Sequence, residues 1–439
     1  MIIKIKKILN YIFFIYLTKF FCMIIIVTKL CVFLWRFINL LKKIKFIDFK
    51  ILIPYFILSS IGIIMILSAS SYNLDQLGKR SSANGLKQLM FFLISLAIIT
   101  IIYKSKNSLY TSVRFQKIIM TCSFMLLIAT TILGLGTVTG GAQRWIQIGP
   151  ISLQPSEFIM LTVILYSSFI FSKREKTIQG HFKDTILGPT LIVSSLILLV
   201  FTQPNVGGAA ILTLIFLVIL FASGIPYPYM IGGFGIMFFF SFIMTQLILF
   251  QGGLLLPQKY HYIYDRFSVV KNPFDYQLDN GYQLVNSYFA IYNGGWFGKG
   301  LGQSIQKKGF LPVAETDFIF SIITEELGVV AAILILALLL FLILRIIAIG
   351  MKATSTFNSL ICIGISAALL IQVFVNLGGI LGFIPLTGVP FPFMSYGGSN
   401  LLTLSIMIGL ILNISADEKK KALNKQMRST HTLQLENSF

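Results

Sequence analysis

The chain has 439 residues, of which 56% are hydrophobic and only 11% are charged, and its formal net charge is +20. This composition excludes an ordinary soluble domain, because apolar runs long enough to cross a bilayer recur along the whole chain. The sequence predicts an all-α polytopic membrane protein, since only helices and closed barrels satisfy their backbone polar groups in lipid.

The first 49 residues are apolar but are interrupted by Lys19, Lys29 and Arg36. They contain no small-residue cleavage site, which argues against a signal peptide. Three interpretations stay open for this extension: a cytoplasmic or interfacial helix, an additional span, or translated sequence upstream of a true start at Met23.

About ten spans follow this extension. We expect them at 50–71, 87–103, 118–137, 155–172, 185–202, 208–224, 229–250, 317–344, 357–380 and 398–414. They form one predicted transmembrane domain, 50–415, followed by a tail, 416–439.

With the amino terminus inside, the predicted cytoplasmic segments hold 25 of the 35 Lys and Arg residues, including basic clusters at 42–50, 104–117, 173–183 and 419–428. The positive-inside rule then predicts that both termini are cytoplasmic. Basic clusters beside spans suit anionic lipid better than nucleic acid, so no nucleic-acid partner is expected. The four cysteines lie in apolar stretches and the three histidines are scattered, so neither a disulfide framework nor a metal site is predicted.

Three connections on the predicted outer face are rich in glycine and polar residues. They are "GLGTVTGGAQRWIQIGPISLQPSEF" after the third span, the large periplasmic loop 251–316 after the seventh, and "GFIPLTGVPFPFMSYGGSN" between the last two. Long ordered loops are uncommon unless they have a function. We therefore expect the functional site on this face.

Asp317 lies where the large loop enters the eighth span. One interpretation is structural, because Thr316 or Asp317 is suited to cap the helix that begins at Phe318. The other is catalytic, with Asp317 as a general base at the outer rim. A helix start lowers the pKa of a carboxylate and burial raises it, so the sequence leaves its protonation open.

Glu325 and Glu326 follow within the same span. Carboxylates inside a membrane are costly, so they have either a structural role, in ion pairs or hydrogen bonds, or a functional role as the polar floor of a site. Glu157 and Arg144 lie in the connection before the fourth span, and Lys87 lies at the start of the second. Arg144 and Lys87 are suited to bind phosphate oxygens. The structural alternatives are that Glu157 is an ordinary acid at a helix start, that Arg144 lies at the membrane interface, and that Lys87 extends its side chain to the interface.

The stretch "SYGGSN" precedes the last span. Its glycines suggest an anion-accepting helix start with exposed amides. Glycines also permit close packing of helices, which is the structural alternative. The residues concerned are Ser395, Tyr396, Gly397, Gly398 and Ser399.

Four stretches, taken in order, resemble the SEDS family of shape, elongation, division and sporulation proteins. They are "GGAQRWIQIGPISLQPSEF", "QPNVGGA", "GYQLVNSYFAIYNGGWFGKGLGQSIQKKGFLPVAETDFIFSIITEELG" and "PLTGVPFPFMSYGGSN", within residues 50–415. The short "GLGQSIQKKGFLP" connection is similar to that of the division branch of the family.

The resemblance implies a glycosyltransferase that polymerises lipid II into septal peptidoglycan during cell division and releases undecaprenyl diphosphate. It implies that Asp317 is essential, and it maps further family motifs onto Arg144, Glu157, Glu325, Glu326 and the segment from Ser395 to Ser399. The sequence departs from the family pattern at Met160, where lysine is usual, and at Asn205, Glu315 and Asn400.

Within this resemblance, we expect Asp317 to activate the acceptor hydroxyl, and Arg144 and Lys87 to contact diphosphate, with Mg²⁺ or Mn²⁺ as a possible cofactor. Implied partners are lipid II, the growing glycan strand, a class B penicillin-binding protein and other division proteins of the bacterial inner membrane at the septum. Two rivals remain: a lipid II flippase, and a catalytically silent division scaffold.

Overall fold

The computed structural model describes residues 45–131, 137–139, 142–148, 151–178, 182–250, 261–279 and 281–436. The prediction for residues 1–49 lies almost wholly outside this part of the chain. The chain divides into two compact units, 49–414 and a smaller one formed by residues up to Asp48 and from Ser415 onwards. In the smaller unit, the Asp48 carboxylate accepts a 3.0 Å hydrogen bond from the Ser415 hydroxyl and lies 3.3 Å from the Nζ of Lys419.

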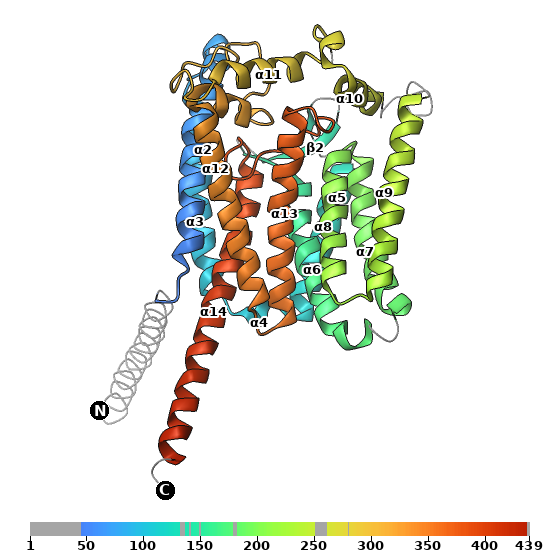
Figure 1. Cartoon of the computed structure of the whole chain (residues 1–439), viewed down its shortest axis with the longest axis vertical. Helices are drawn as coiled ribbons and strands as arrows, with labels where there is room; N and C mark the ends of the chain where they lie inside the picture. The colour runs from blue at the N-terminus through green and yellow to red at the C-terminus, as the bar shows by residue number, and fades with distance from the viewer. Residues whose placement is uncertain are drawn as a thin grey trace, which may run out of the picture. The chain divides into compact units, whose positions relative to one another are not determined.

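Ten long helices in the described part of the chain correspond to the ten predicted spans and form the bundle of the larger unit, with α14 continuing beyond that unit (Figure 1). They are α2 (Phe49–Gln76), α3 (Ala83–Lys104), α5 (Val113–Thr131), α6 (Pro155–Ile178), α7 (Phe182–Thr202), α8 (Val206–Ala222), α9 (Tyr227–Phe250), α12 (Ile319–Met351), α13 (Thr356–Ile380) and α14 (Gly398–Glu436). Within the described residues, eight helices are long and apolar enough to cross a membrane. Of the other two, α8 has 17 residues and α9 has 24. The predicted polytopic all-α class is confirmed.

Helices α6, α8 and α13 meet in the core at Gly364. A Cβ atom added there would lie 2.8 Å from Ile219 Cδ1 and 2.9 Å from Ile164 Cγ2, both on fully buried side chains. Because small residues let membrane helices approach closely, Gly364 allows these three helices to pack against one another. The core therefore holds α13, and the residues near the carboxyl end of this helix contribute to the candidate site.

A small antiparallel sheet begins at Thr137, the last residue of one predicted span. It comprises β1 (Thr137–Thr139), β2 (Ala142–Ile148) and β3 (Ile151–Leu153) in that order, with Thr137 opposite Trp145 and Ile146 opposite Leu153. The prediction of a helix over 118–137 was wrong at Thr137, which lies in β1; α5 is described as far as Thr131, and residues 132–136 lie outside the described residues. β-Branched residues in both β1 and β2 favour pleated pairing over helix.

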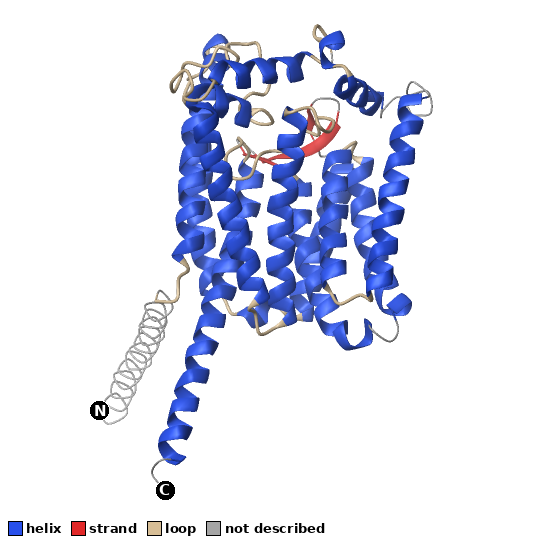
Figure 2. Ribbon diagram, viewed as in Figure 1, coloured by secondary structure: helices blue, strands red, loops and turns tan. Residues whose placement is uncertain are grey.

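The elements between α9 and α12 lie across the same end of the bundle as this sheet (Figures 1 and 2). They are α10 (His261–Lys271), the short 3₁₀ helix η2 (Pro273–Tyr276) and α11 (Tyr282–Gly294). The short helix α4 (Asn107–Tyr110) joins α3 to α5. The three polar connections identified in the sequence thus contribute to one end of the molecule.

Helix α12 is broken at Gly328, which adopts φ 85° and ψ 167°. Val329 and Val330 donate their amides to the carbonyls of Gly295 and Trp296. The carbonyls of Glu325 and Glu326 accept from the amides of Lys299 and Gly300 instead. The segment Gly295–Gly300 is therefore inserted into the hydrogen-bond ladder of α12, so that the break leaves none of these four helix groups unpaired.

Candidate active site

Asp317 lies immediately before α12 but does not cap it. The N-cap residue is Phe318, which makes no side-chain capping bond, so the capping interpretation was wrong. The Nδ2 of Asn376, near the end of α13, donates 2.8 Å hydrogen bonds to the carbonyls of Asp317 and Val389. Asn376 thus joins the Asp317 backbone to the connection between α13 and α14, and the Asp317 carboxylate is not used for capping.

The connection between α13 and α14 also holds the residues before Asp317. Ser395 Oγ donates a 2.6 Å hydrogen bond to the Thr316 carbonyl, and the Tyr396 amide donates a 2.8 Å bond to the Glu315 carbonyl. The Phe320 and Phe391 rings stack with centroids 5.0 Å apart. Ser395 and Tyr396 therefore position the backbone at Asp317, which is a supporting role that the sequence left open.

One glycine of the last motif, Gly398, allows close packing. A Cβ on Gly398 would lie 2.4 Å from the Phe91 ring, and the Gly397 amide donates to Gln88 Oε1 at 3.4 Å. Ser399 Oγ accepts from the Gln154 amide at 2.9 Å. Gln88 is buried, whereas Lys87 is exposed, so it is Gln88 that contacts this motif. These contacts favour the close-packing interpretation for Gly398, whereas a Cβ on Gly397 would make only an ordinary 3.6 Å contact with Asn400 Cβ.

Arg266 of α10, which the sequence analysis missed, interacts electrostatically with Asp317. Its guanidinium donates to the Leu386 carbonyl and lies 5.3 Å from the centroid of the Tyr262 ring. Burial raises the pKa of Asp317 to about 6, and Arg266 opposes this rise. A basic residue in a long polar loop usually faces water, so the sequence offered little reason to select Arg266. The one available signal was that Arg266 follows Tyr262 by four residues, which places the two side chains side by side if the segment is a helix.

Glu315 adds a second carboxyl group near Asp317. Burial raises the pKa of the Glu315 carboxyl, and the charge of Glu315 contributes to the raised pKa of Asp317 and of Tyr396. Glu315 Oε2 is buried without a hydrogen-bond partner. The departure from the family pattern at this position therefore places an unsatisfied acceptor beside the candidate base.

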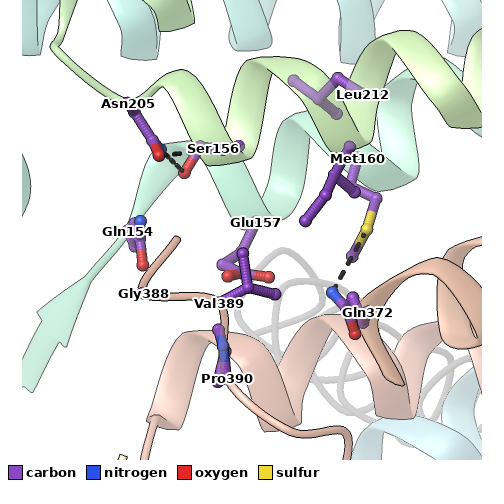
Figure 3. Close-up of a pocket in the computed structure, with 12 residues that line it drawn as sticks. Gln154, Ser156, Glu157, Met160, Asn205, Leu212, Gln372, Gly388, Val389 and Pro390 are labelled. Carbon is purple, nitrogen blue, oxygen red and sulfur yellow. Dashed lines mark hydrogen bonds between the residues drawn. The ribbon is translucent and has the colours of Figure 1, made fainter. Parts of the chain in front are cut away.

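A cavity of about 50 Å³ lies between α6, α8 and α13 (Figure 3). Its lining includes Glu157, Met160 and Asn205, and the segment Gly388–Pro390 forms one side. A Cβ on Gly388 would lie 3.4 Å from Asp317 Oδ2, so this segment adjoins both the cavity and Asp317. A water needs at least about 10–15 Å³ on this measure, so the cavity has room for a few waters and not for a sugar.

Three of the four departures from the family pattern gather around Glu157. Asn400 Nδ2 donates a 3.0 Å hydrogen bond to Glu157 Oε2, and Met160 accepts a 3.6 Å contact at sulfur from Gln372 Nε2. Asn205 caps α8 by accepting from the Gly208 amide at 3.1 Å. Glu157 thus has a neutral amide as its partner. Asn205 is the N-cap of α8, a position for which Asn and Asp are both suited.

Glu325 and Glu326 are structural, as one of the two interpretations predicted. Glu326 accepts from the Ser68 hydroxyl and the Gly302 amide and lies 2.7 Å from the Nζ of Lys307. Glu325 accepts from the Ser304 hydroxyl and from the amides of two loop residues, Ile305 and Gln306. Neither residue lines the cavity. Both bind the loop that follows α11.

Arg144 lies in β2, and its side chain is outside the described part of the structure. Among the described residues, no group of three or more His, Cys, Asp or Glu is placed to hold a metal ion. The site therefore consists of Asp317, Glu315 and Arg266, supported by the connection between α13 and α14. A carboxylate with a pKa near neutrality is suited to accept a proton, and a guanidinium is suited to bind an oxyanion.

This fold defines a polytopic membrane protein, in which the candidate site of Asp317, Glu315 and Arg266 lies at one end of the helix bundle. A family model described as "Cell cycle protein", FTSW_RODA_SPOVE, matches residues 49–420. The chain belongs to this family, as the motif resemblance predicted.

Relatives of known name extend over most of the chain. A protein of Lactococcus lactis named "Probable peptidoglycan glycosyltransferase FtsW" is 40% identical over 403 residues, covering 88% of this chain and 96% of that protein. "Stage V sporulation protein E" of Bacillus subtilis is 34% identical over 371 residues, covering 84% of this chain and 96% of that protein.

Solved structures share the fold. A chain of the structure described as "Structural coordination of polymerization and crosslinking by a peptidoglycan synthase complex" has a TM-score of 0.67 at 22% identity, covering 85% of this chain and 98% of that one. The crystal structure of the rod shape determining protein RodA of Thermus thermophilus has a TM-score of 0.60 at 22% identity, covering 85% and 97%.

Proposed function

We propose that this protein is a peptidoglycan glycosyltransferase of the FtsW type, which polymerises lipid II at the division septum and releases undecaprenyl diphosphate. The observation that carries the proposal is the interaction of Asp317, with a pKa of about 6, with Arg266. The names of the relatives, at up to 41% identity, support the reaction class.

The chemistry follows from the two charged groups. Asp317 removes the proton from the acceptor sugar hydroxyl, whose oxygen then attacks the anomeric carbon of the donor. The bond from that carbon to the diphosphate oxygen breaks, and negative charge develops on the diphosphate. Arg266, an exposed residue, is suited to bind this charge in bidentate fashion.

The residues present also fit a divalent cation such as Mg²⁺ or Mn²⁺. Asp317 and the unsatisfied Oε2 of Glu315 would hold it, since Mg²⁺ commonly binds one or two carboxylates together with substrate phosphates. When bound, such a cation neutralises charge on the leaving diphosphate. Arg144 and Lys87 remain the further candidates, proposed from the sequence, for contact with the diphosphate.

Orientation and partners complete the proposal. Both termini face the cytoplasm, so α10, α11 and the sheet face outwards, where lipid II presents its headgroup. A class B penicillin-binding protein is the proposed partner, because polymerised strands must be crosslinked. The description of the structurally similar complex as coordinating polymerisation and crosslinking supports this pairing.

The test uses labelled lipid II, the purified protein with its cognate penicillin-binding protein, and a gel that resolves glycan strands. We expect strands with the unsubstituted protein, none with Asp317→Asn, and at least a tenfold lower rate with Arg266→Gln. Asp275→Asn, an exposed carboxylate of η2, is the matched control and retains full activity. Strand formation by Asp317→Asn at the normal rate would overturn the assignment.

The same preparations distinguish the rival functions. A flippase moves labelled lipid II across a vesicle bilayer without chain growth, and a silent scaffold gives no strands even with its partner present. Either result with the unsubstituted protein, together with intact binding of the penicillin-binding protein, replaces the glycosyltransferase proposal by the corresponding rival.

A further inference from the structure

The break in α12 lies close to one end of its membrane-spanning part. From Val329 to Met351 the helix is about 35 Å long at 1.5 Å per residue, which exceeds the ~30 Å of a bilayer hydrocarbon core. This part of α12 therefore spans the membrane without the piece that precedes Gly328. The break then lies near the boundary between lipid and water, at the end of the bundle that carries α11.

The segment inserted at this break exposes large aromatic side chains. Tyr292, in the last turn of α11, is 85% exposed, and Trp296 and Phe297 are 70% and 86% exposed. The Trp296 carbonyl accepts from the Val330 amide at 3.2 Å, so this aromatic cluster, Tyr292, Trp296 and Phe297, is fixed to the end of the span. Its depth is set by backbone hydrogen bonds.

The aromatic cluster continues the lipid-facing surface of α12. Val330, Ile333 and Leu334 are exposed on α12, followed by Phe341 and Leu344 at helical spacing. On a helix that crosses a membrane, such a stripe faces acyl chains. The cluster begins where this stripe ends, with Trp296 bonded to the first residue of the stripe.

We propose that Tyr292, Trp296 and Phe297 insert into the outer lipid leaflet at the boundary between headgroups and acyl chains, and anchor the large outer loop to the membrane. Trp and Tyr concentrate at this depth because their rings are apolar and their N–H and O–H groups stay hydrated. Three such rings in water would form an exposed apolar patch, which a protein surface normally covers.

A second protein is the competing occupant. A helix of a partner subunit packed on this surface would bury the rings in a dry protein interface, whereas lipid surrounds them with acyl chains and headgroups. The inference does not depend on the proposed enzymatic activity, because insertion rests on the span and on the inserted segment; the choice of the outer leaflet rests on the orientation given under the proposed function.

Tryptophan fluorescence tests the depth directly, since the chain has three tryptophans. Substitutions Trp35→Phe and Trp145→Phe leave Trp296 alone. The protein is reconstituted into phosphatidylethanolamine–phosphatidylglycerol vesicles that contain lipids brominated near the headgroup or near the chain end. We expect the shallow bromines to quench most of the Trp296 emission, the deep bromines to quench less, and aqueous iodide to quench little.

The matched control moves the probe to another exposed apolar position of the same loop. Leu278, 87% exposed between η2 and α11, is replaced by Trp in a protein whose three tryptophans are Phe. This probe should respond to iodide and not to brominated lipid. Equal lipid quenching at both positions, iodide quenching of Trp296, or protection of Trp296 from both quenchers would overturn the proposal; the last result would identify a protein interface.

The unsubstituted chain provides a second measurement that does not depend on the folding of variants. A phospholipid with a diazirine near the headgroup is activated in the same vesicles, and crosslinked peptides are identified by mass spectrometry. Adducts within Tyr292–Phe297 are expected, with none at Leu278. Adducts absent from Tyr292–Phe297 but present on the exposed stripe of α12 would exclude the aromatic anchor.

Discussion

Lys307 Nζ lies 2.7 Å from Glu326 Oε1, and both side chains are almost fully buried. The same ammonium group donates to Ser68 Oγ on α2 at 2.7 Å. This pair therefore joins the loop between α11 and α12 to two different helices, α2 and α12.

Replacing Lys307 by Met should destabilise the protein by about 3–5 kcal/mol, because it leaves the Glu326 carboxylate buried without its cation. Thermal unfolding in detergent measures the loss. Lys308→Met, at the exposed neighbouring position, is the control and should unfold at the normal temperature. The double variant K307M/E326Q should recover part of the loss, and a single variant as stable as the unsubstituted protein would contradict this account.

Gly328→Ala should cost more than about 1 kcal/mol and should loosen the segment Gly295–Gly300. Gly328 has φ 85°, and a Cβ there would lie 2.4 Å from the Trp296 carbonyl oxygen. Hydrogen exchange of the Val329 and Val330 amides reports the loosening. Gly232→Ala in α9, where an added Cβ meets nothing within 4 Å, is the matched control. Unchanged protection in Gly328→Ala would mean that the break does not depend on glycine.

The rate of polymerisation should fall as the pH drops through about 6, because protonated Asp317 no longer accepts a proton. Removing Arg266 removes the charge that opposes the raised pKa, so in Arg266→Gln the midpoint should move to higher pH. A pH profile at saturating lipid II measures both. A midpoint that stays in place in Arg266→Gln would show that Arg266 does not act on Asp317.

Stability should depend on pH in the opposite sense. The pKa of Asp317 is about 6 in the folded protein against an ordinary value of 3.8, so the folded state binds the proton more tightly than the unfolded state. Stability conferred by the protonated group is present below about pH 4 and is lost as the pH rises to about 6. Melting temperatures of the unsubstituted protein and Asp317→Asn, compared across this range, should diverge as the pH rises. Parallel curves would exclude the shift.

Asn400→Leu should cost about 1–3 kcal/mol, because Glu157 loses its hydrogen-bond donor. Met160→Lys places an ammonium group in the cavity beside Glu157 and should restore part of the stability in the double variant. Thermal unfolding measures both effects. If Met160→Lys lowers the stability of N400L further, then a lysine at position 160 cannot replace Asn400 as the partner of the Glu157 carboxylate.

The spans could be predicted because hydropathy is local, and α2, α6 and α13 begin within about two residues of their expected starts. The end of α5 could not be predicted in this way, because the pairing of Thr137 with Trp145 competes with helix only once β2 is in place. The break at Gly328 was also invisible, since its hydrogen-bond partners lie some 30 residues earlier in the chain.

Within the site, a motif identified Asp317, but the sequence did not reveal what surrounds it. Arg266 is about 50 residues away and becomes relevant only when α10 contacts Leu386. The roles of Glu325 and Glu326 were undecided because their partners, Ser304 and Lys307, belong to a loop whose path the sequence does not specify. The residue types thus indicated which side chains could be functional or structural, but only the tertiary structure showed which of them pair with one another.

The backbone exchange between Gly295–Gly300 and α12 has a consequence for biosynthesis. The donor and acceptor groups that complete the helix are made before the helix itself, since residue 295 leaves the ribosome ahead of residue 329. During membrane integration the interrupted turn of α12 therefore meets hydrogen-bond partners that have already been synthesised. An N-terminal truncation that ends between these two stretches would remove the partners, and a circular permutation there would place them after the helix.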